Sequence, residues 1–108
     1  MYSDQLLKAK ALPHRMAAFS HCFRAEAGRG QHSFGLYRLH QFSKVEMFAI
    51  TRGEDLSQSH AVLDEFVAIQ EEVLQELGLR YRVLDMASEE LGAAAFKKYD
   101  IEAWMPSK

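Results

Sequence analysis

The clearest hydrophobic pattern along the chain lies between residues 57 and 77. Apolar residues recur there at steps of three and four, which is the spacing of one face of a helix: Val62, Phe66, Ile69, Val73 and Leu77. Acidic and amide residues fill half of the other positions, and Gly78 follows as a C-terminal cap. The spacing therefore predicts a helix over 57–77, whose apolar stripe is more typical of the cover of a sheet than of a docking surface.

Two stretches before this helix are typical of β-strands joined by a loop. Residues 14–26 are rich in Met, Phe and Ala, and residues 35–51 alternate imperfectly between apolar and polar side chains. Two glycines and several polar residues predict a loop over 27–33, so we expect the two strands to be antiparallel. One face of the second strand carries mostly apolar residues, namely Tyr37, Leu39, Val45 and Met47.

Shorter elements are predicted at the two ends of the chain. We expect a short helix over about 3–10, which Pro13 prevents from continuing. After the long helix, the pattern predicts a strand over 80–86, a second helix over 88–98 with acidic residues in its first turn, and a strand over 100–105. The order α-β-β-α-β-α-β indicates an α+β fold, an antiparallel sheet flanked by helices, with a thin core.

Composition narrows the range of functions. The 108 residues fit one domain, and 13 basic against 15 acidic residues give a net charge of −2, which excludes a strongly cationic nucleic-acid-coating module. The single cysteine, Cys22, excludes an internal disulfide framework, and no apolar run approaches the length of a membrane span. No two of the five histidines stand three or four residues apart, so a structural metal site is disfavoured.

Candidate chemistry gathers on one face of the two predicted strands. Arg24 and Glu26 leave the first strand on the same side, and the second strand presents a mixed polar face: Arg38, His40, Phe42, Lys44 and Glu46. Such a face could bind a polyanion through arginine, stack a planar base on Phe42, and hold an ammonium group with Glu46. The alternative is a solvated face with cross-strand ion pairs, which the spacing alone favours.

A resemblance to a known family favours a ligand-binding face over a solvated face with ion pairs. Residues 22–26, followed by a loop and then residues 35–46, resemble the second signature motif of class II aminoacyl-tRNA synthetases. The order Arg-x-Glu, loop, Phe-x-Lys-x-Glu is similar to the version found in seryl-tRNA synthetases. The residues themselves look closest to those of animal mitochondrial members. Further segments also resemble that family: residues 11–16, 77–86, 90–92 and 97–106.

The resemblance implies an ATP-dependent ligase that converts serine to seryl-adenylate and passes serine to tRNA(Ser). Arg24 would be the catalytic residue at the α-phosphate, Glu26 would approach the adenine amino group, and Phe42 would stack on adenine. The ATP-binding set that the resemblance implies is Arg24, Ala25, Glu26, Leu39, His40, Gln41 and Phe42. Glu46 would bind the substrate serine, and the loop over 27–34 would face the acceptor end of the tRNA.

The chain also departs from the family. Residues 1–108 resemble a partial catalytic domain, with the second motif as a hairpin at about 20–48, but no arm that grips tRNA, first motif or third motif is recognisable. We therefore expect Mg²⁺ and a homodimer only in a full enzyme, with the metal ligands and the dimer interface outside these residues, and we expect the chain alone to be inactive. The alternative is a naturally short, non-catalytic binding module. The resemblance implies the mitochondrial matrix, with the cytoplasm as the alternative location.

Overall fold

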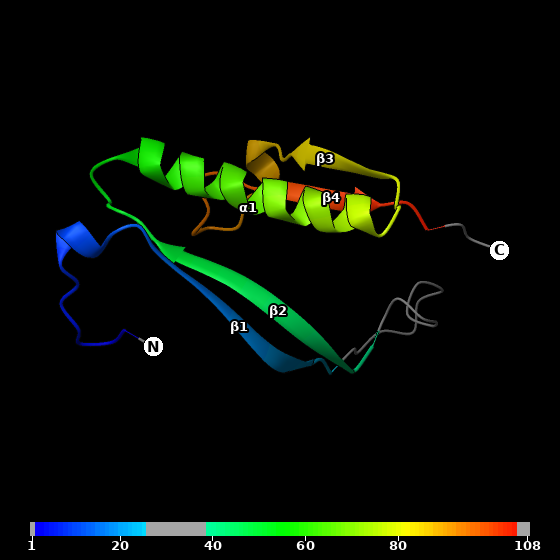
Figure 1. The fold of residues 1–108 in the computed structure, drawn as a ribbon, viewed down its shortest axis with the longest axis horizontal. Helices are drawn as coiled ribbons and strands as arrows, with labels where there is room; N and C mark the ends of the chain where they lie inside the picture. The colour runs from blue at the N-terminus through cyan, green and yellow to red at the C-terminus, as the bar shows by residue number, and fades with distance from the viewer. Residues whose placement is uncertain (1, 26–38, 106–108) are drawn as a thin grey trace. The chain divides into compact units, whose positions relative to one another are not determined.

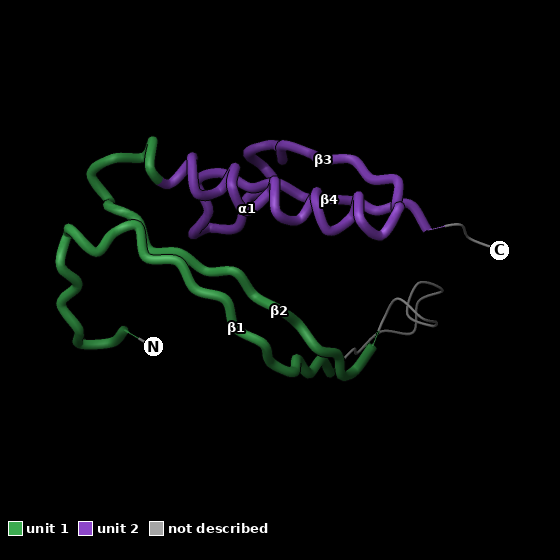
Figure 2. Tube along the Cα trace, in the orientation of Figure 1, with its two compact units in different colours: residues 1–58 green, residues 59–108 purple. Residues whose placement is uncertain are grey.

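The computed structural model describes residues 2–25 and 39–105. Its elements follow the chain as a 3₁₀ turn at Ala9–Ala11, β1 (His14–Phe23), β2 (Gln41–Ile50), α1 (Leu56–Glu76), β3 (Tyr81–Asp85), a 3₁₀ turn at Ser88–Glu90 and β4 (Tyr99–Ala103) (Figure 1). Both strand pairs are antiparallel, so the predicted α+β class is confirmed. The chain divides into two compact units, Met1–Gln58 and Ser59–Lys108 (Figure 2).

Unit 1 is built on a long two-stranded ribbon. All ten residues of β1 pair with β2, from His14 opposite Ile50 to Phe23 opposite Gln41. Large apolar side chains remain exposed on this ribbon, including Phe19 at 68% and Val45 at 68% of their full accessible surface. Val45, which belongs to the apolar face predicted for the second strand, is therefore exposed to solvent instead of buried.

Helix α1 is capped at both ends by hydrogen bonds with the flanking residues. Asp55 precedes the helix, and its Oδ1 accepts hydrogen bonds from the Ser57 backbone N–H at 2.9 Å and the Ser57 hydroxyl at 2.5 Å. At the other end Gly78 has φ of +68° and donates to the Gln75 carbonyl at 2.9 Å, while Leu79 donates to the Leu74 carbonyl at 3.0 Å. This pair of bonds is a Schellman motif, which confirms the predicted glycine cap.

Unit 2 combines α1 with the short β3–β4 pair. The Tyr81 hydroxyl of β3 accepts a hydrogen bond from the Gln75 amide at 2.6 Å and donates to the Glu71 carboxylate at 3.1 Å, so it joins the strand pair to the helix. Val62 of α1, 5% exposed, is the one buried hydrophobic residue within the described ranges. The expectation of even a thin core was therefore too generous for these residues.

Two predicted helices are wrong. Over 3–10 the structure has a turn at residues 3–4 and a 3₁₀ turn at Ala9–Ala11, because a helix of one or two turns is marginal without packing. Over 88–98 it has the 3₁₀ turn at Ser88–Glu90 and a second turn, in which the Ala95 N–H donates to the Gly92 carbonyl at 2.9 Å. The Met86 N–H donates to the Lys98 carbonyl at 3.0 Å, which continues the β3–β4 pairing and holds this end of the segment extended. Tertiary pairing has overridden a local helical preference at this position.

Candidate functional site

One face of the β1–β2 ribbon carries several of the polar groups that were predicted to share a face. The register pairs Ala18 with Glu46 and Cys22 with Phe42, so even-numbered residues of both strands leave the ribbon on the same side. We call this side the even face. It comprises His14, Met16, Ala18, Ser20 and Cys22 from β1, and Phe42, Lys44, Glu46, Phe48 and Ile50 from β2.

Arg24 and Phe42 meet at the loop end of the even face. The strand pairing continues one step past β1, because the Arg24 N–H donates to the His40 carbonyl at 2.8 Å. The His40 Nδ1 lies 3.1 Å from the Arg24 carbonyl oxygen, and the Arg24 guanidinium carbon lies 4.9 Å from the centre of the Phe42 ring. A cation over an aromatic ring at this distance is an attractive contact, and it places a planar, permanently charged donor beside a ring face.

Lys44 and Glu46 form an ion pair farther along the same face. The Lys44 Nζ lies 2.5 Å from the Glu46 Oε2, and the two side chains are 50% and 55% exposed. The hydrogen bond to the Glu46 carboxylate, and then its charge, raise the pKa of the Lys44 ammonium above the ordinary value of 10.5. The pair runs along β2, whereas the sequence analysis weighed ion pairs that cross between the strands.

A small apolar pocket adjoins Glu46. It has a volume of about 250 Å³ and is lined by Met16, Ala18, Glu46 and Phe48, all of which belong to the even face. Met16 and Phe48 were not predicted as neighbours of the site. Their signal was present, since both continue the even-numbered positions of strands whose other members were already assigned.

The even face therefore has two chemically different ends. At one end a guanidinium and an aromatic ring can bind a phosphate and stack a planar base. At the other end the Glu46 carboxylate can accept hydrogen bonds from an ammonium group beside an apolar pocket. Phe42 and Glu46 are four residues apart on one strand, which corresponds to about 13 Å. Arg24, Phe42 and Glu46 are thus brought together on one surface.

The remaining residues of the predicted ATP-binding set are not all placed on the even face. Glu26 and the loop over 27–34 fall outside the described residues. Ala25 and Leu39 are exposed at the two ends of the gap, and Leu39 retains 47% of its accessible surface. Gln41 pairs with Phe23 on the opposite face of the ribbon from Phe42, so the structure does not bring its side chain to the even face.

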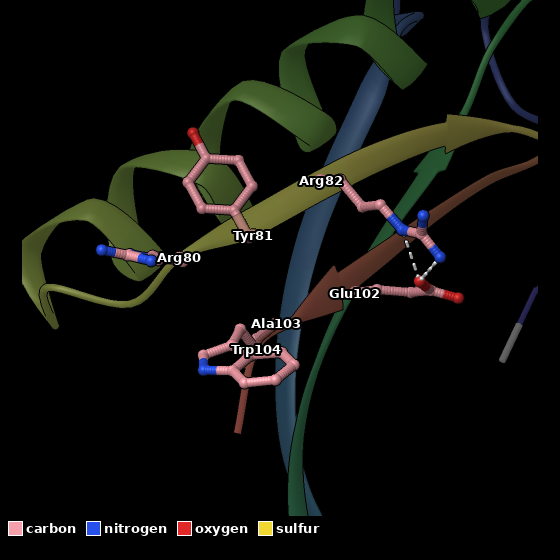
Figure 3. Close-up of a pocket in the computed structure, with 6 residues that line it drawn as sticks. All are labelled: Arg80, Tyr81, Arg82, Glu102, Ala103 and Trp104. Atoms are coloured by element: carbon pink, nitrogen blue, oxygen red, sulfur yellow. Dashed lines mark hydrogen bonds and ion pairs between the residues drawn. The ribbon is translucent and has the colours of Figure 1, made fainter. Parts of the chain in front are cut away.

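A larger pocket of about 440 Å³ lies in unit 2, on the β3–β4 pair (Figure 3). There both the Nε and Nη2 of Arg82 donate to one oxygen of Glu102, at 2.7 and 2.6 Å. The Trp104 side chain is 63% exposed and therefore does not pack into a core. Trp104 directly follows β4, and its N–H donates to the Arg80 carbonyl at 2.7 Å, so the paired backbone leaves the indole on the surface. Among the residues that the structure describes, no predicted ATP- or serine-binding residue lines this pocket.

The structure also bears on metals and membranes. Over residues 2–25 and 39–105 no three His, Cys, Asp or Glu side chains are grouped closely enough to hold a metal ion. The described part of the even face offers one carboxylate, Glu46, which Lys44 already contacts, so it does not fit a Mg²⁺ site. Within the same ranges, no helix has the length and apolar character that crossing a bilayer requires.

Comparison with known proteins assigns the chain to a family. Residues 1–108 match the family model of the tRNA synthetase class II core domain (G, H, P, S and T). The chain belongs to this family. The antiparallel α+β fold agrees with this assignment.

Individual relatives carry a more specific name. The mitochondrial serine–tRNA ligase of Mus musculus is 51% identical over 107 residues, which cover 99% of this chain and 20% of that protein. The serine–tRNA ligase of Borreliella burgdorferi is 59% identical over 98 residues, which cover 90% of this chain and 22% of that protein. The chain thus spans about a fifth of the length of these relatives. Mitochondrial and bacterial enzymes match at similar levels, so the similarity alone does not identify a compartment.

Proposed function

We propose that this chain provides the ATP- and serine-binding hairpin of a serine–tRNA ligase. The observation that carries the proposal is the even face, on which Arg24 and Phe42 lie at one end and Glu46 at the other. In a class II core protein, this arrangement suits a substrate pair that has a base and phosphates on one side and an ammonium group on the other. The relatives named serine–tRNA ligase support serine as the amino acid.

The reaction needs positioned charges more than a nucleophilic side chain. A carboxylate oxygen of serine attacks the α-phosphorus of ATP, the bond to the bridging oxygen breaks, and pyrophosphate leaves with its electron pair. Arg24 would bind the α-phosphate and stabilise the charge that develops there, Phe42 would stack on the adenine, and Glu46 would bind the serine ammonium. A hydroxyl at the end of tRNA(Ser) would then attack the carbonyl carbon of seryl-adenylate, so that an ester bond to the seryl group forms and AMP leaves.

Binding of ATP requires one rearrangement of the site. Arg24 now lies over the Phe42 ring, the surface that the proposal gives to adenine. A cation–π contact at an exposed position contributes only about 0.5–1 kcal/mol, whereas a guanidinium that binds phosphate forms two charge-assisted hydrogen bonds. The phosphate is therefore the stronger partner, and we expect Arg24 to leave the ring when ATP binds.

The proposal assigns the chain a share of the whole activity. We infer that the isolated 108 residues do not catalyse adenylate formation, because the described residues form no metal site and the chain spans about a fifth of the length of its relatives. Homodimer formation and binding of tRNA(Ser) would belong to the longer protein. The mitochondrial relatives from mouse and cattle support a place in the mitochondrial matrix, which an import assay with the native protein would test.

A chimera tests the function directly. The segment of the mouse mitochondrial relative that matches this chain is replaced by residues 1–108, so that the mouse protein supplies everything else. We expect serine-dependent exchange of pyrophosphate into ATP, with no exchange when alanine or threonine replaces serine. The intact mouse enzyme is the positive control. A folded, dimeric chimera that shows no serine-dependent exchange would contradict the proposed function.

The isolated chain is measured beside the chimera. We expect no serine-dependent exchange above the background of its Arg24→Ala variant. Exchange by the unmodified chain above that background would show that these residues suffice for catalysis, and the inferred partial role would then be wrong.

A further inference from the structure

Lys44 lies between the two ends of the even face. It is two residues from Phe42 and two from Glu46 on β2, which places it about 7 Å along the strand from each. Its cross-strand neighbour is Ser20, and the neighbour of Glu46 is Ala18, so both facing positions hold small, uncharged side chains. The long Lys44 side chain therefore has room to lie along the strand, and its ammonium contacts the Glu46 carboxylate.

This ion pair is poorly suited to stabilising the fold. Both side chains are half exposed, and ion pairs in contact with water contribute little to stability because water and salt screen them. The same weakness makes the contact easy to exchange. An ammonium group from a ligand can replace the Lys44 ammonium on the Glu46 carboxylate without leaving a charge unpaired in a buried place.

We propose that Lys44 is a positioning residue for the amino-acid end of the site: its ammonium holds the Glu46 carboxylate in place until the ammonium of the substrate takes over that contact. The inference rests on the proposed function, because it needs an amino acid that binds at Glu46. It adds a role for a residue to which the proposed reaction gives none. Without Lys44 the Glu46 side chain can turn among its rotamers, and part of the binding energy of serine is spent on fixing it.

The first experiment uses the chimera and compares kinetic constants. Lys44→Met removes the charge at nearly constant length, and we expect the KM for serine to rise about fivefold, the size of effect expected for an exposed ion pair. The KM for ATP and kcat should stay within about twofold, because neither the nucleotide end nor the reacting atoms are altered. Lys44→Arg should restore most of the serine affinity, since a guanidinium also reaches the carboxylate.

A matched control is available in unit 2. The Lys98 Nζ lies 3.2 Å from the Asp100 Oδ2, again two residues apart in sequence and half exposed. Lys98→Met should leave all three kinetic constants unchanged. An unchanged KM for serine in Lys44→Met would overturn the proposal, as would a change confined to the KM for ATP or to kcat, which would instead assign Lys44 to the phosphates.

A second experiment is independent of catalysis. In the 108-residue chain, side-chain scalar couplings measured by NMR report how many χ1 rotamers Glu46 populates. We expect one dominant rotamer in the unmodified chain and in Lys44→Arg, and rotamer averaging in Lys44→Met. Averaging already present in the unmodified chain, or one rotamer retained in Lys44→Met, would overturn the positioning role. An inactive chimera with the expected NMR result would contradict the proposed function, and with it the role of Lys44 at the amino-acid end, although Lys44 would still order the Glu46 side chain.

Discussion

The β1–β2 ribbon and unit 2 differ in the length of their strands and in the side chains that they bury. The ribbon has two strands of ten residues, and its even face carries Arg24, Phe42 and Glu46 beside an open pocket. The strands of unit 2 have five residues each, and a capped 21-residue helix is hydrogen bonded to them through Tyr81. The ribbon thus presents the candidate chemistry, whereas unit 2 contains the one buried apolar side chain in the described ranges, Val62.

This difference shows why a binding face is costly for a small structure. A face that receives a ligand must stay open, so it cannot be buried to stabilise the strands that form it. The other face of the ribbon is also exposed at Phe19 and Val45, and an isolated two-stranded hairpin is at best marginally stable in water. We therefore expect changes on the even face to alter ligand binding and rate, and changes in unit 2 to alter stability.

Arg24→Ala should show the largest effect. In the active chimera we expect the rate of serine-dependent pyrophosphate exchange to fall about 10²- to 10³-fold, the usual loss when a group that stabilises the transition state is removed. The midpoint of thermal unfolding should not change. Arg82→Ala is the matched control, because it removes an arginine that is paired with Glu102 in unit 2. A similar loss of rate in both variants would remove the functional distinction between the two regions.

Glu46→Gln should have the next largest effect, on the other end of the even face. The amide keeps the shape of the carboxylate but loses its charge, so we expect the KM for serine to rise about 10- to 100-fold, as for loss of one charged hydrogen bond. The KM for ATP should change little. Glu102→Gln in unit 2 is the control, and a rise in the KM for ATP equal to that for serine would show that Glu46 does not belong to a separate amino-acid end.

The sequence was sufficient for the elements whose pattern is long and regular. Spacings of three and four predicted α1 within one residue at each end, and Gly78 marked its end. The start of the helix was less clear from the sequence. The residue that caps it is Asp55, whose side chain accepts a hydrogen bond from the Ser57 N–H. The helix predicted over 88–98 failed because pairing with β3 reaches back to Lys98, which no local pattern reveals.

The sequence was enough to predict which site residues share a face of their strand, but not which residues contact one another. Alternation alone placed Phe42, Lys44 and Glu46 on the same side of one strand. The register of the partner strand was not predictable, because the loop between the strands does not fix which residues face each other. That register puts Ala18 and Ser20 opposite the charged residues, so the ion pair that forms runs along the strand instead of across it.

Val62→Ala should show the largest effect on stability. It removes two methyl groups from a side chain that is 5% exposed, and we expect a loss of about 2 kcal/mol, or roughly 30-fold in the opening equilibrium of α1. Hydrogen exchange of the α1 amides measures this effect. Val45→Ala, at a 68% exposed position of the ribbon, is the control and should change exchange little. Equal acceleration in the ribbon would show that the two units unfold together.

Gly78→Ala should have a smaller effect in the same unit. A methyl group at this position would meet no atom within 4 Å, so the only cost is the positive φ of +68°, about 1 kcal/mol for alanine. Gly53→Ala is the matched control in unit 1, since its added methyl group also meets nothing and its φ is not in the left-handed region. We expect faster exchange in the last turn of α1 for Gly78→Ala alone. Equal exchange in both variants would mean that the Schellman motif does not hold the helix end.

The smallest expected effect is a pH dependence at the start of α1. The hydrogen bond from the Ser57 hydroxyl, and then that from its backbone N–H, lower the pKa of Asp55 below the ordinary value of 3.8. Because the pKa is lower in the folded state than in the unfolded state, the cap stabilises the helix fully above about pH 4 and is lost as the pH falls through the folded pKa.

We therefore expect hydrogen exchange of the first α1 amides, corrected for its intrinsic pH dependence, to accelerate below about pH 4. Asp55→Asn keeps an acceptor for the Ser57 N–H but does not titrate, so it should abolish this acceleration. Ser57→Ala removes the hydroxyl donor and should move the acceleration to higher pH. The same acid response in Asp55→Asn as in the unmodified chain would show that another group titrates, and the pH dependence would then no longer distinguish the helix from the ribbon.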